Sequence, residues 1–298
     1  VQAVRNLGGQ VVLHGDSFDV ANKYAKQRAA DEGLVFIPPY DDELVIAGQG
    51  TIANELLRQW RDVEYVFVAV GGGGLISGVA AYLGEVAPHV KVIAVEYEES
   101  ACLKAALDTG ERVILPHVGL FADGTAVAQI GELPFEMVRL RKSDNSGPIV
   151  EPNVVTVNTD EICAAIKDTY DENRSIVEPS GAMALAGIKK YVAEHGLTDK
   201  NMVSIVCGAN MNFDRLRYIA ERTELGERKE AIYAVTIPEQ KGAFLQFCRA
   251  LQGRNITEFN YRASDNNQAQ VFVGISLKGG ETERHEIHEL LKQNYDVD

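Results

Sequence analysis

The sequence predicts an α/β protein built on a doubly wound, mostly parallel sheet, followed by a smaller α+β module. Three observations lead to this fold class. Apolar runs of strand length alternate with helix-length amphipathic segments as far as about residue 220, as in sheets covered by helices on both faces. Residues 66–78 read VFVAVGGGGLISG, which is a buried strand, four glycines and a helix start. Beyond residue 230 the order becomes β-α-β-β-α-β, which is typical of ferredoxin-like modules.

Each element of the larger part follows from its local pattern. Short runs of Val, Ile and aromatic residues predict strands, and apolar residues spaced three or four apart predict helices. Residues 36–40 are expected to be extended, because the residue before a proline avoids the α region. In chain order we expect a β-rich run at 10–13, helices at 19–32 and 46–60, a strand at 66–70, a helix to about 85, a strand at 92–95, a helix at 159–173 and a strand ending at 204–207.

The smaller module follows a charged, linker-like stretch at 221–230. Within it, the alternation of apolar residues at 270–277 predicts a half-buried strand. The elements expected there are strands at 231–237, 255–262 and 270–277, helices at 241–251 and 281–293, a turn at 264–267 and the start of a fourth strand at 295–298.

Composition limits the classes of function. The chain has 298 residues and a formal net charge of −14, which argues against nucleic acid and anionic membranes as partners, since both attract basic surfaces. No apolar run approaches the roughly 18 residues that a membrane-spanning helix needs. The four cysteines are widely spaced and form no CxxC pair, so we expect reduced thiols and no metal site.

The four glycines from Gly71 to Gly74 are the strongest chemical signal. Without Cβ atoms, a turn between a strand and a helix can bring its N–H groups close to a phosphate at the positive end of the helix. A P-loop is excluded, because no Lys followed by Ser or Thr comes after Gly78. A single phosphate ester, as in pyridoxal phosphate, fits this continuous turn best. A turn that needs glycine only for packing is the alternative.

Nucleotide binding is a second, weaker alternative. The glycine spacing that starts at Gly72 nearly matches a dinucleotide-binding fingerprint. In addition, Glu96 follows the next strand, where a ribose-binding acid would lie.

Six segments, in order along nearly the whole chain, carry a family resemblance. They are IPPYDDELVIAGQGT (37–51), VAVGGGGLISG (68–78), GLFADGTAV (119–127), VEPSGAMALAG (177–187), CGANMNFDRLR (207–217) and AERTELGER (220–228). The glycine turn, the EPSGA segment and the CGAN segment are specific in combination. Together the six segments resemble the threonine dehydratases of the biosynthetic, allosteric kind.

The resemblance implies a fold-type II pyridoxal phosphate enzyme that converts L-threonine to 2-oxobutanoate and ammonia, the first step of isoleucine biosynthesis. It leaves L-serine open as a further substrate. It also implies a homotetramer with ACT-like regulatory modules, isoleucine as the inhibitor and valine as an activator. Such a protein would be cytoplasmic in a bacterium and would lie in a plastid or mitochondrion in a eukaryote.

The resemblance also assigns site residues. Cys207 lies where the family places a Ser or Cys against the pyridine nitrogen, and a small buried core residue is the alternative. Glu178 is a candidate catalytic or orienting residue beside the cofactor, and a helix-capping carboxylate is its alternative. No metal ligand is expected. The cofactor-binding residues assigned in this way are Gly71, Gly72, Gly73, Gly74, Leu75 and Cys207.

Two parts of the family pattern do not occur in residues 1–298. The Schiff-base lysine belongs to a Ser-x-Lys-x-Arg-Gly segment, and a second ACT-like module follows the first; neither is found. We therefore expect a chain truncated at both ends. Its expected parts are a remnant of the small cofactor subdomain at 1–45, a large pyridoxal-phosphate-binding domain at 46–222 and the first ACT-like module at 223–298.

Two other functions stay open at this point. Within the same class, the alternative is a serine dehydratase or serine racemase, although the short members of the family lack the ACT-like tail. From another class, the alternative is a non-catalytic regulatory protein that binds an amino acid.

Overall fold

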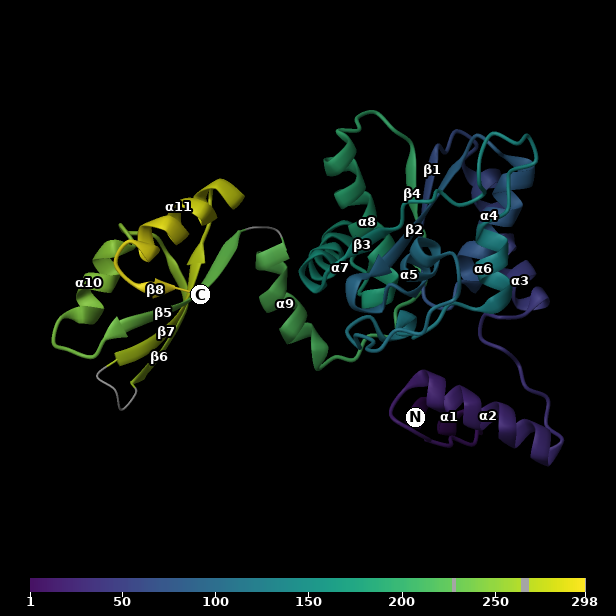
Figure 1. The fold of residues 1–298 in the computed structure, drawn as a ribbon, viewed down its shortest axis with the longest axis horizontal. Coiled ribbons are helices and arrows are strands. Elements are labelled where there is room, and N and C mark those ends of the chain that lie inside the picture. Colours follow the sequence, from purple (N-terminus) through teal and green to yellow (C-terminus); the bar gives the residue numbers. More distant parts are fainter. Residues whose placement is uncertain (227–228, 264–267, 298) are drawn as a thin grey trace. The chain divides into compact units, whose positions relative to one another are not determined.

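The structure is a computed structural model that describes residues 1–226, 229–263 and 268–297. The turn expected at 264–267 lies outside these residues. The chain divides into two compact units, which are described separately (Figure 1): residues 1–158 with 169–211, and residues 159–168 with 212–298. The domain boundaries after residues 45 and 222 stay predictions.

The first unit is built on a four-stranded parallel sheet in the order β3-β2-β1-β4. Its strands are β1 (Tyr65–Ala69), β2 (Lys91–Tyr97), β3 (Val155–Val157) and β4 (Met202–Ser204). The chain moves outward from β1 through β2 to β3, and then returns to the other side of β1 at β4. In sheets of this kind, ligands bind beyond the carboxyl ends of the strands where the order reverses. That point lies between β1 and β4.

Helices cover both faces of this sheet. Val66, Val68 and Val70 pack in one core cluster with side chains of α4, whereas Phe67 faces Tyr191 of α8. All five residues of β1 are buried, which explains its continuous apolar run. The doubly wound parallel sheet is therefore confirmed. All the helices of the first unit, whether or not they lie on the sheet, are α1 (Gln2–Asn6), α2 (Phe18–Glu32), α3 (Glu43–Gln59), α4 (Gly74–Val86), α5 (Cys102–Thr109), α6 (Glu132–Val138) and α8 (Pro179–His195), with α7 (Thr159–Asn173) divided between the units.

The segment before α3 differs from the expectation in two places. The β-rich run at 10–13 forms no strand. Among the described residues no strand pairs with it, and an isolated extended segment has no ladder of hydrogen bonds to hold it. Helix α3 begins at Glu43, earlier than expected, because the Asp42 carboxylate accepts hydrogen bonds from the N–H groups of Leu44 and Val45.

The second unit contains a four-stranded antiparallel sheet in the order β6-β7-β5-β8. Alternate residues of β5, among them Tyr233 and Val235, are buried in the core of this unit. The predicted β-α-β-β-α-β module is confirmed. Its elements are β5 (Glu230–Pro238), α10 (Ala243–Ala250), β6 (Ile256–Ala263), β7 (Gln268–Ser276), α11 (Gly280–Lys292) and β8 (Asp296–Val297).

The prediction of a linker-like stretch at 221–230 is wrong for residues 221–226, which continue helix α9 (Arg215–Gly226). Arg222 pairs with Asp160 at 2.6 Å. The buried Thr223 hydroxyl interacts with the carbonyl oxygens of Ile219 and Cys163. These contacts join α9 to the start of α7. The charged sequence of this segment does not predict them, because they are made with residues far away in the chain.

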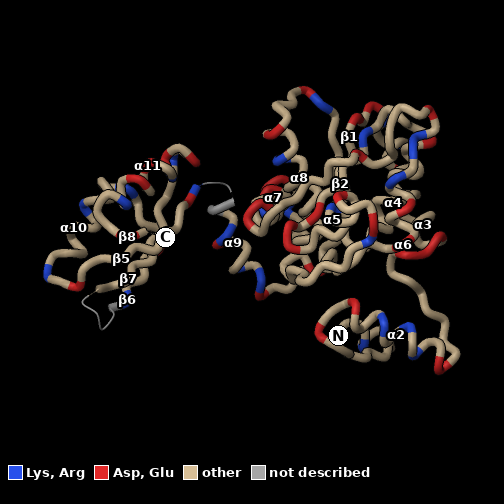
Figure 2. Tube along the Cα trace, viewed as in Figure 1, with Lys and Arg blue, Asp and Glu red and all other residues tan. Residues whose placement is uncertain are grey.

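Charge is mixed along the chain. Asp and Glu outnumber Lys and Arg by 43 to 29, and Figure 2 shows the two signs interspersed along the trace. No helix in the described ranges combines the length and the apolar character that crossing a bilayer requires.

Candidate active site

Strands β1 and β4 are neighbours in the sheet (Figure 1), and the predicted site residues meet at their carboxyl ends, where the strand order reverses. Gly71 follows β1 after one residue, and Cys207 follows β4 after two. All the glycines of the turn, together with Leu75, Glu178 and Cys207, line one cavity of about 340 Å³. The structure therefore brings together every residue that the sequence singled out for the cofactor.

The carbonyl groups of the glycine turn have internal partners. The Gly71 carbonyl accepts a hydrogen bond from the Cys102 thiol, with an S···O distance of 3.4 Å. The next two carbonyls along the turn accept from the N–H groups of Gly131, at 3.0 Å, and Ser77, at 3.1 Å. Each of these three consecutive carbonyl groups therefore accepts a hydrogen bond from another part of the protein.

This pattern turns the N–H groups of Gly72, Gly73 and Gly74 the other way, because the C=O and the following N–H of a trans peptide point in opposite directions. None of these three N–H groups donates to another described residue. They lie at the N-terminus of α4, where the helix dipole favours negative charge. Three consecutive free donors in that position can hold an anion such as a phosphate.

The same glycines also meet packing requirements. Gly73 has a φ of 91°, in the left-handed region that favours glycine, and a Cβ there would lie 2.6 Å from Cδ1 of Ile130. A Cβ on Gly72 would collide with the Tyr40 ring. The packing alternative therefore has support of its own, but packing alone does not explain why the N–H groups lack acceptors.

Cys207 presents a neutral thiol to the cavity. The thiol donates to the Ser180 carbonyl at 3.5 Å. Burial of the thiol raises its pKa, and the negative charge of Glu178 adds to the effect, although the residue as a whole is exposed. At physiological pH Cys207 is therefore protonated, with a weak donor and a weak acceptor.

Two hydroxyl groups in the cavity were not predicted from the sequence. The Oγ atoms of Thr125 and Ser180 lie 3.2 Å apart, and the Thr125 hydroxyl also lies 3.0 Å from the Ala122 carbonyl oxygen. Ser180 belongs to the EPSGA segment at the start of α8, so that motif was the available signal. Thr125 lies far away in the sequence, in the GLFADGTAV segment (119–127), so that segment was its available signal.

Glu178 holds the segment that carries Cys207. Its carboxylate accepts a hydrogen bond from the Asn210 N–H at 3.0 Å, and its own N–H donates to the Gly208 carbonyl at 3.2 Å. The side chain makes no capping bond to α8, so the capping alternative is wrong. The carboxylate instead joins the 207–210 segment to the first turn of α8.

Glu96 does not reach the cavity, and the nucleotide alternative is therefore wrong. Its side chain is completely buried, and its two oxygens accept hydrogen bonds from the N–H groups of Leu103 and Lys104, both at 2.8 Å. A ribose could not approach it. The chain turns into α5 soon after β2, so an acid at the strand end becomes the cap of the next helix.

Metal binding finds no support at this site. Among the described residues, no group of three or more His, Cys, Asp or Glu side chains is placed to hold an ion. Asp123 lines the cavity from a short 3-10 helix, Asp123–Thr125.

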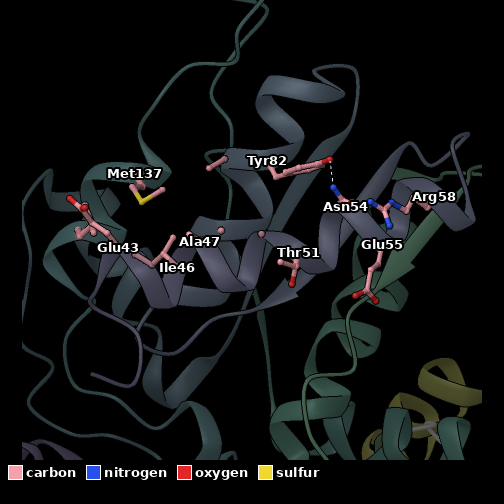
Figure 3. A pocket seen from close by; sticks show the side chains of 13 residues that line it. Glu43, Ile46, Ala47, Thr51, Asn54, Glu55, Arg58, Tyr82 and Met137 are labelled. Carbon is pink, nitrogen blue, oxygen red and sulfur yellow. Dashed lines mark hydrogen bonds between the residues drawn. The ribbon is translucent and has the colours of Figure 1, made fainter. Parts of the chain in front are cut away.

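A larger cavity of about 840 Å³ runs along α3 and contains none of the predicted residues. In Figure 3 the Asn54 side chain donates to the Tyr82 hydroxyl, at 2.7 Å, with Glu55 and Arg58 close by. Its lining includes neither the free N–H groups of the glycine turn nor a thiol. The features that suit a phosphorylated cofactor therefore belong to the smaller cavity.

Two known protein families match different parts of the chain, with a boundary close to the one between the two compact units. Residues 1–208 match the family described as pyridoxal-phosphate dependent enzyme. Residues 221–298 match the C-terminal regulatory domain of threonine dehydratase.

Individual proteins extend this similarity. The biosynthetic L-threonine dehydratase IlvA of Escherichia coli strain K12 is 51% identical over 98% of this chain and 55% of its own length. The chloroplastic biosynthetic threonine dehydratase of Arabidopsis thaliana is 48% identical over 93% of this chain and 45% of its own length. The chain thus spans about half the length of the curated relatives that it matches.

Solved structures show the same fold. The processed form of threonine deaminase isoform 2 from Solanum lycopersicum superimposes with a TM-score of 0.67 and 45% identity, over 74% of this chain and 62% of that chain. Maize serine racemase superimposes with a TM-score of 0.63 and 28% identity, over 74% of this chain and 66% of that chain.

Proposed function

Because the chain belongs to the family of pyridoxal-phosphate dependent enzymes, we propose that its first unit holds pyridoxal phosphate and that the whole protein is a biosynthetic threonine dehydratase. This reaction eliminates water from L-threonine, and hydrolysis of the product releases ammonia and 2-oxobutanoate. The observation that carries the proposal is the run of free N–H groups at Gly72–Gly74, in the cavity that Cys207 also lines. Similarity to a dehydratase over 98% of the chain supports the substrate.

Different residues of the cavity would contact different parts of the cofactor. The N–H groups of Gly72–Gly74 would bind its phosphate, and Leu75 would close the turn. Cys207 would contact the pyridine nitrogen, and a neutral thiol does not keep that nitrogen protonated as a carboxylate would. When bound, the cofactor supplies an electron sink for the charge left at the substrate's Cα. The weaker sink that a neutral partner produces suits loss of the β-hydroxyl group.

Glu178 would act as a positioning residue. Its carboxylate is engaged by the Asn210 N–H, and through that bond it keeps Cys207 in place. The hydroxyl groups of Thr125 and Ser180, which line the same cavity, would then help to orient the cofactor or the substrate.

A regulatory role for the second unit is supported by the family match over residues 221–298. We expect it to bind an amino-acid effector, with isoleucine as inhibitor and valine as activator, in a homotetramer. The similar proteins include bacterial, chloroplastic and mitochondrial ones. The proposed location is accordingly the cytoplasm in a bacterium and a plastid or mitochondrion in a eukaryote.

The test is turnover by the whole protein, loaded with pyridoxal phosphate and offered L-threonine or L-serine separately. We expect 2-oxobutanoate from L-threonine. Formation of D-serine without 2-oxobutanoate would favour the serine racemase alternative. Binding of isoleucine without turnover of either amino acid would favour the non-catalytic regulatory protein.

A further inference from the structure

One of the carbonyl contacts in the glycine turn differs from the others. The carbonyls of Gly72 and Gly73 accept from backbone N–H groups, but the Gly71 carbonyl accepts from a side chain, the Cys102 thiol, at 3.4 Å. Cys102 is the first residue of α5, and its exposed fraction is 0%. The orientation of the first peptide in the turn therefore depends on where one buried thiol lies.

The place of that thiol is set by Glu96. Its carboxylate binds the N–H groups of Leu103 and Lys104 in the first turn of α5, where negative charge also stabilises the helix. Strand β2 pairs in register with β1 as far as the pair Ala69–Val95, and the next residue, Glu96, pairs with Thr156 of β3, so the sheet fixes its backbone. A continuous set of contacts thus runs from the sheet through Glu96 and α5 back to the glycine turn.

We propose that Glu96 and Cys102 are positioning residues for the phosphate-binding turn, an inference that rests on the function proposed above. By holding the Gly71 carbonyl, the thiol fixes the peptide plane, so that the Gly72 N–H on its opposite side faces the phosphate. Neither Glu96 nor Cys102 lines the cavity, so neither touches the cofactor. Their effect is to orient a donor before the ligand arrives, which lowers the cost of ordering on binding.

The thiol can act as a donor only while it keeps its proton. Burial, followed by the negative charge of Glu96, raises the pKa of Cys102 well above its ordinary value. Cys102 therefore stays protonated throughout the physiological range. The thiol also lies within hydrogen-bond range of the Glu96 carboxylate, so it contacts both this carboxylate and the Gly71 carbonyl group, whose oxygen lies 3.4 Å from the sulfur.

The test compares two ligands of the whole apoprotein: pyridoxal phosphate, and pyridoxal, which lacks the phosphate. Equilibrium titration followed by absorbance yields both dissociation constants. In Cys102→Ala, the affinity advantage of pyridoxal phosphate over pyridoxal should fall about three- to tenfold, the range for loss of one weak hydrogen bond. Glu96→Gln should also lower this affinity advantage. The glutamine side chain has one oxygen that can accept an N–H bond, but its nitrogen is a donor and cannot accept the second one. Cys102→Ser keeps a donor and should retain most of the advantage.

The matched control is Cys163→Ala, which removes an equally buried thiol from α7 and should leave the advantage unchanged. Thermal unfolding and circular dichroism confirm that each variant is folded. If wild-type protein binds pyridoxal phosphate but Cys102→Ala loses nothing, or loses affinity for both ligands equally, the positioning role is overturned. If wild-type protein does not bind pyridoxal phosphate, the proposed function and the positioning role fall together.

Discussion

Replacing Glu96 by Gln tests whether burial raises the pKa of this carboxyl group in the folded protein. Burial, only partly offset by the N–H groups of Lys104 and Leu103, raises the pKa of Glu96 from 4.5 to about 7. Between these two values the folded protein holds a proton that the unfolded chain has lost. The folded state is then the form that binds more protons, so its stability must fall as the pH rises from about 4.5 to about 7.

The separation of the two pKa values, about 2.5, corresponds to a loss of about 3 kcal/mol in unfolding free energy across this window. The assay is urea unfolding at a series of pH values, followed by the fluorescence of Trp60. This is the single tryptophan of the chain and it lies in the first unit. Glu96→Gln cannot ionise, so its unfolding free energy should lack this fall.

Glu64→Gln is the matched control. Hydrogen bonds from the Lys200 ammonium and the Asn201 N–H hold the pKa of Glu64 below its ordinary value. Its contribution to stability is therefore lost only as the pH falls below that ordinary value, and its replacement should leave the slope at higher pH as in wild type. The reasoning is refuted if Glu96→Gln and wild type lose stability equally as the pH rises from about 5 to about 7.

Residues 1–298 alone should not release 2-oxobutanoate from L-threonine, because the segment that carries the Schiff-base lysine in the resembling family does not occur in them; release by the purified chain would contradict this. Millimolar isoleucine should lower threonine turnover by the whole protein, and deletion of residues 231–298 should abolish that response; an identical response in the deletion variant would disprove regulation by this module. Gly73→Val should weaken binding of pyridoxal phosphate and also lower the unfolding temperature, because Gly73 has a φ of 91°; unchanged cofactor affinity would place the phosphate elsewhere.

The core of the first unit could be predicted because its strands are buried on both faces and therefore read as unbroken apolar runs. The convergence of the glycine turn and Cys207 could also be predicted. Both follow strands of one parallel sheet, and parallel strands end at the same edge. The second unit could be predicted because its strands alternate between buried and exposed residues, as β5 does.

Contacts between residues distant in sequence could not be predicted. Cys102 and Gly71 are 31 residues apart, and Thr125 and Ser180 are 55 apart. The local pattern around each residue says nothing of its partner. Glu96 shows the same limit, since an acid at a strand end can face a ligand or cap the next helix, and the path of the chain into α5 decides between the two.

Strand propensity failed where no sheet was present to accept the strand. Residues 10–13 have suitable side chains, but propensity describes how well a residue fits a pleated, half-buried surface. The described residues offer that segment no such surface. The opposite error arose at 221–226, where charged residues suggested a linker but a buried Thr223 and the Arg222–Asp160 pair hold a helix.

The central claim is that the N–H groups of Gly72, Gly73 and Gly74 bind the phosphate of the cofactor. The most direct measurement is an amide correlation spectrum of the whole protein labelled with nitrogen-15 glycine, recorded with pyridoxal phosphate and with pyridoxal. The three glycine signals should move strongly with pyridoxal phosphate and stay in place with pyridoxal, because only the former carries the group that they bind. Signals that move equally with both ligands, or with neither, would contradict the claim.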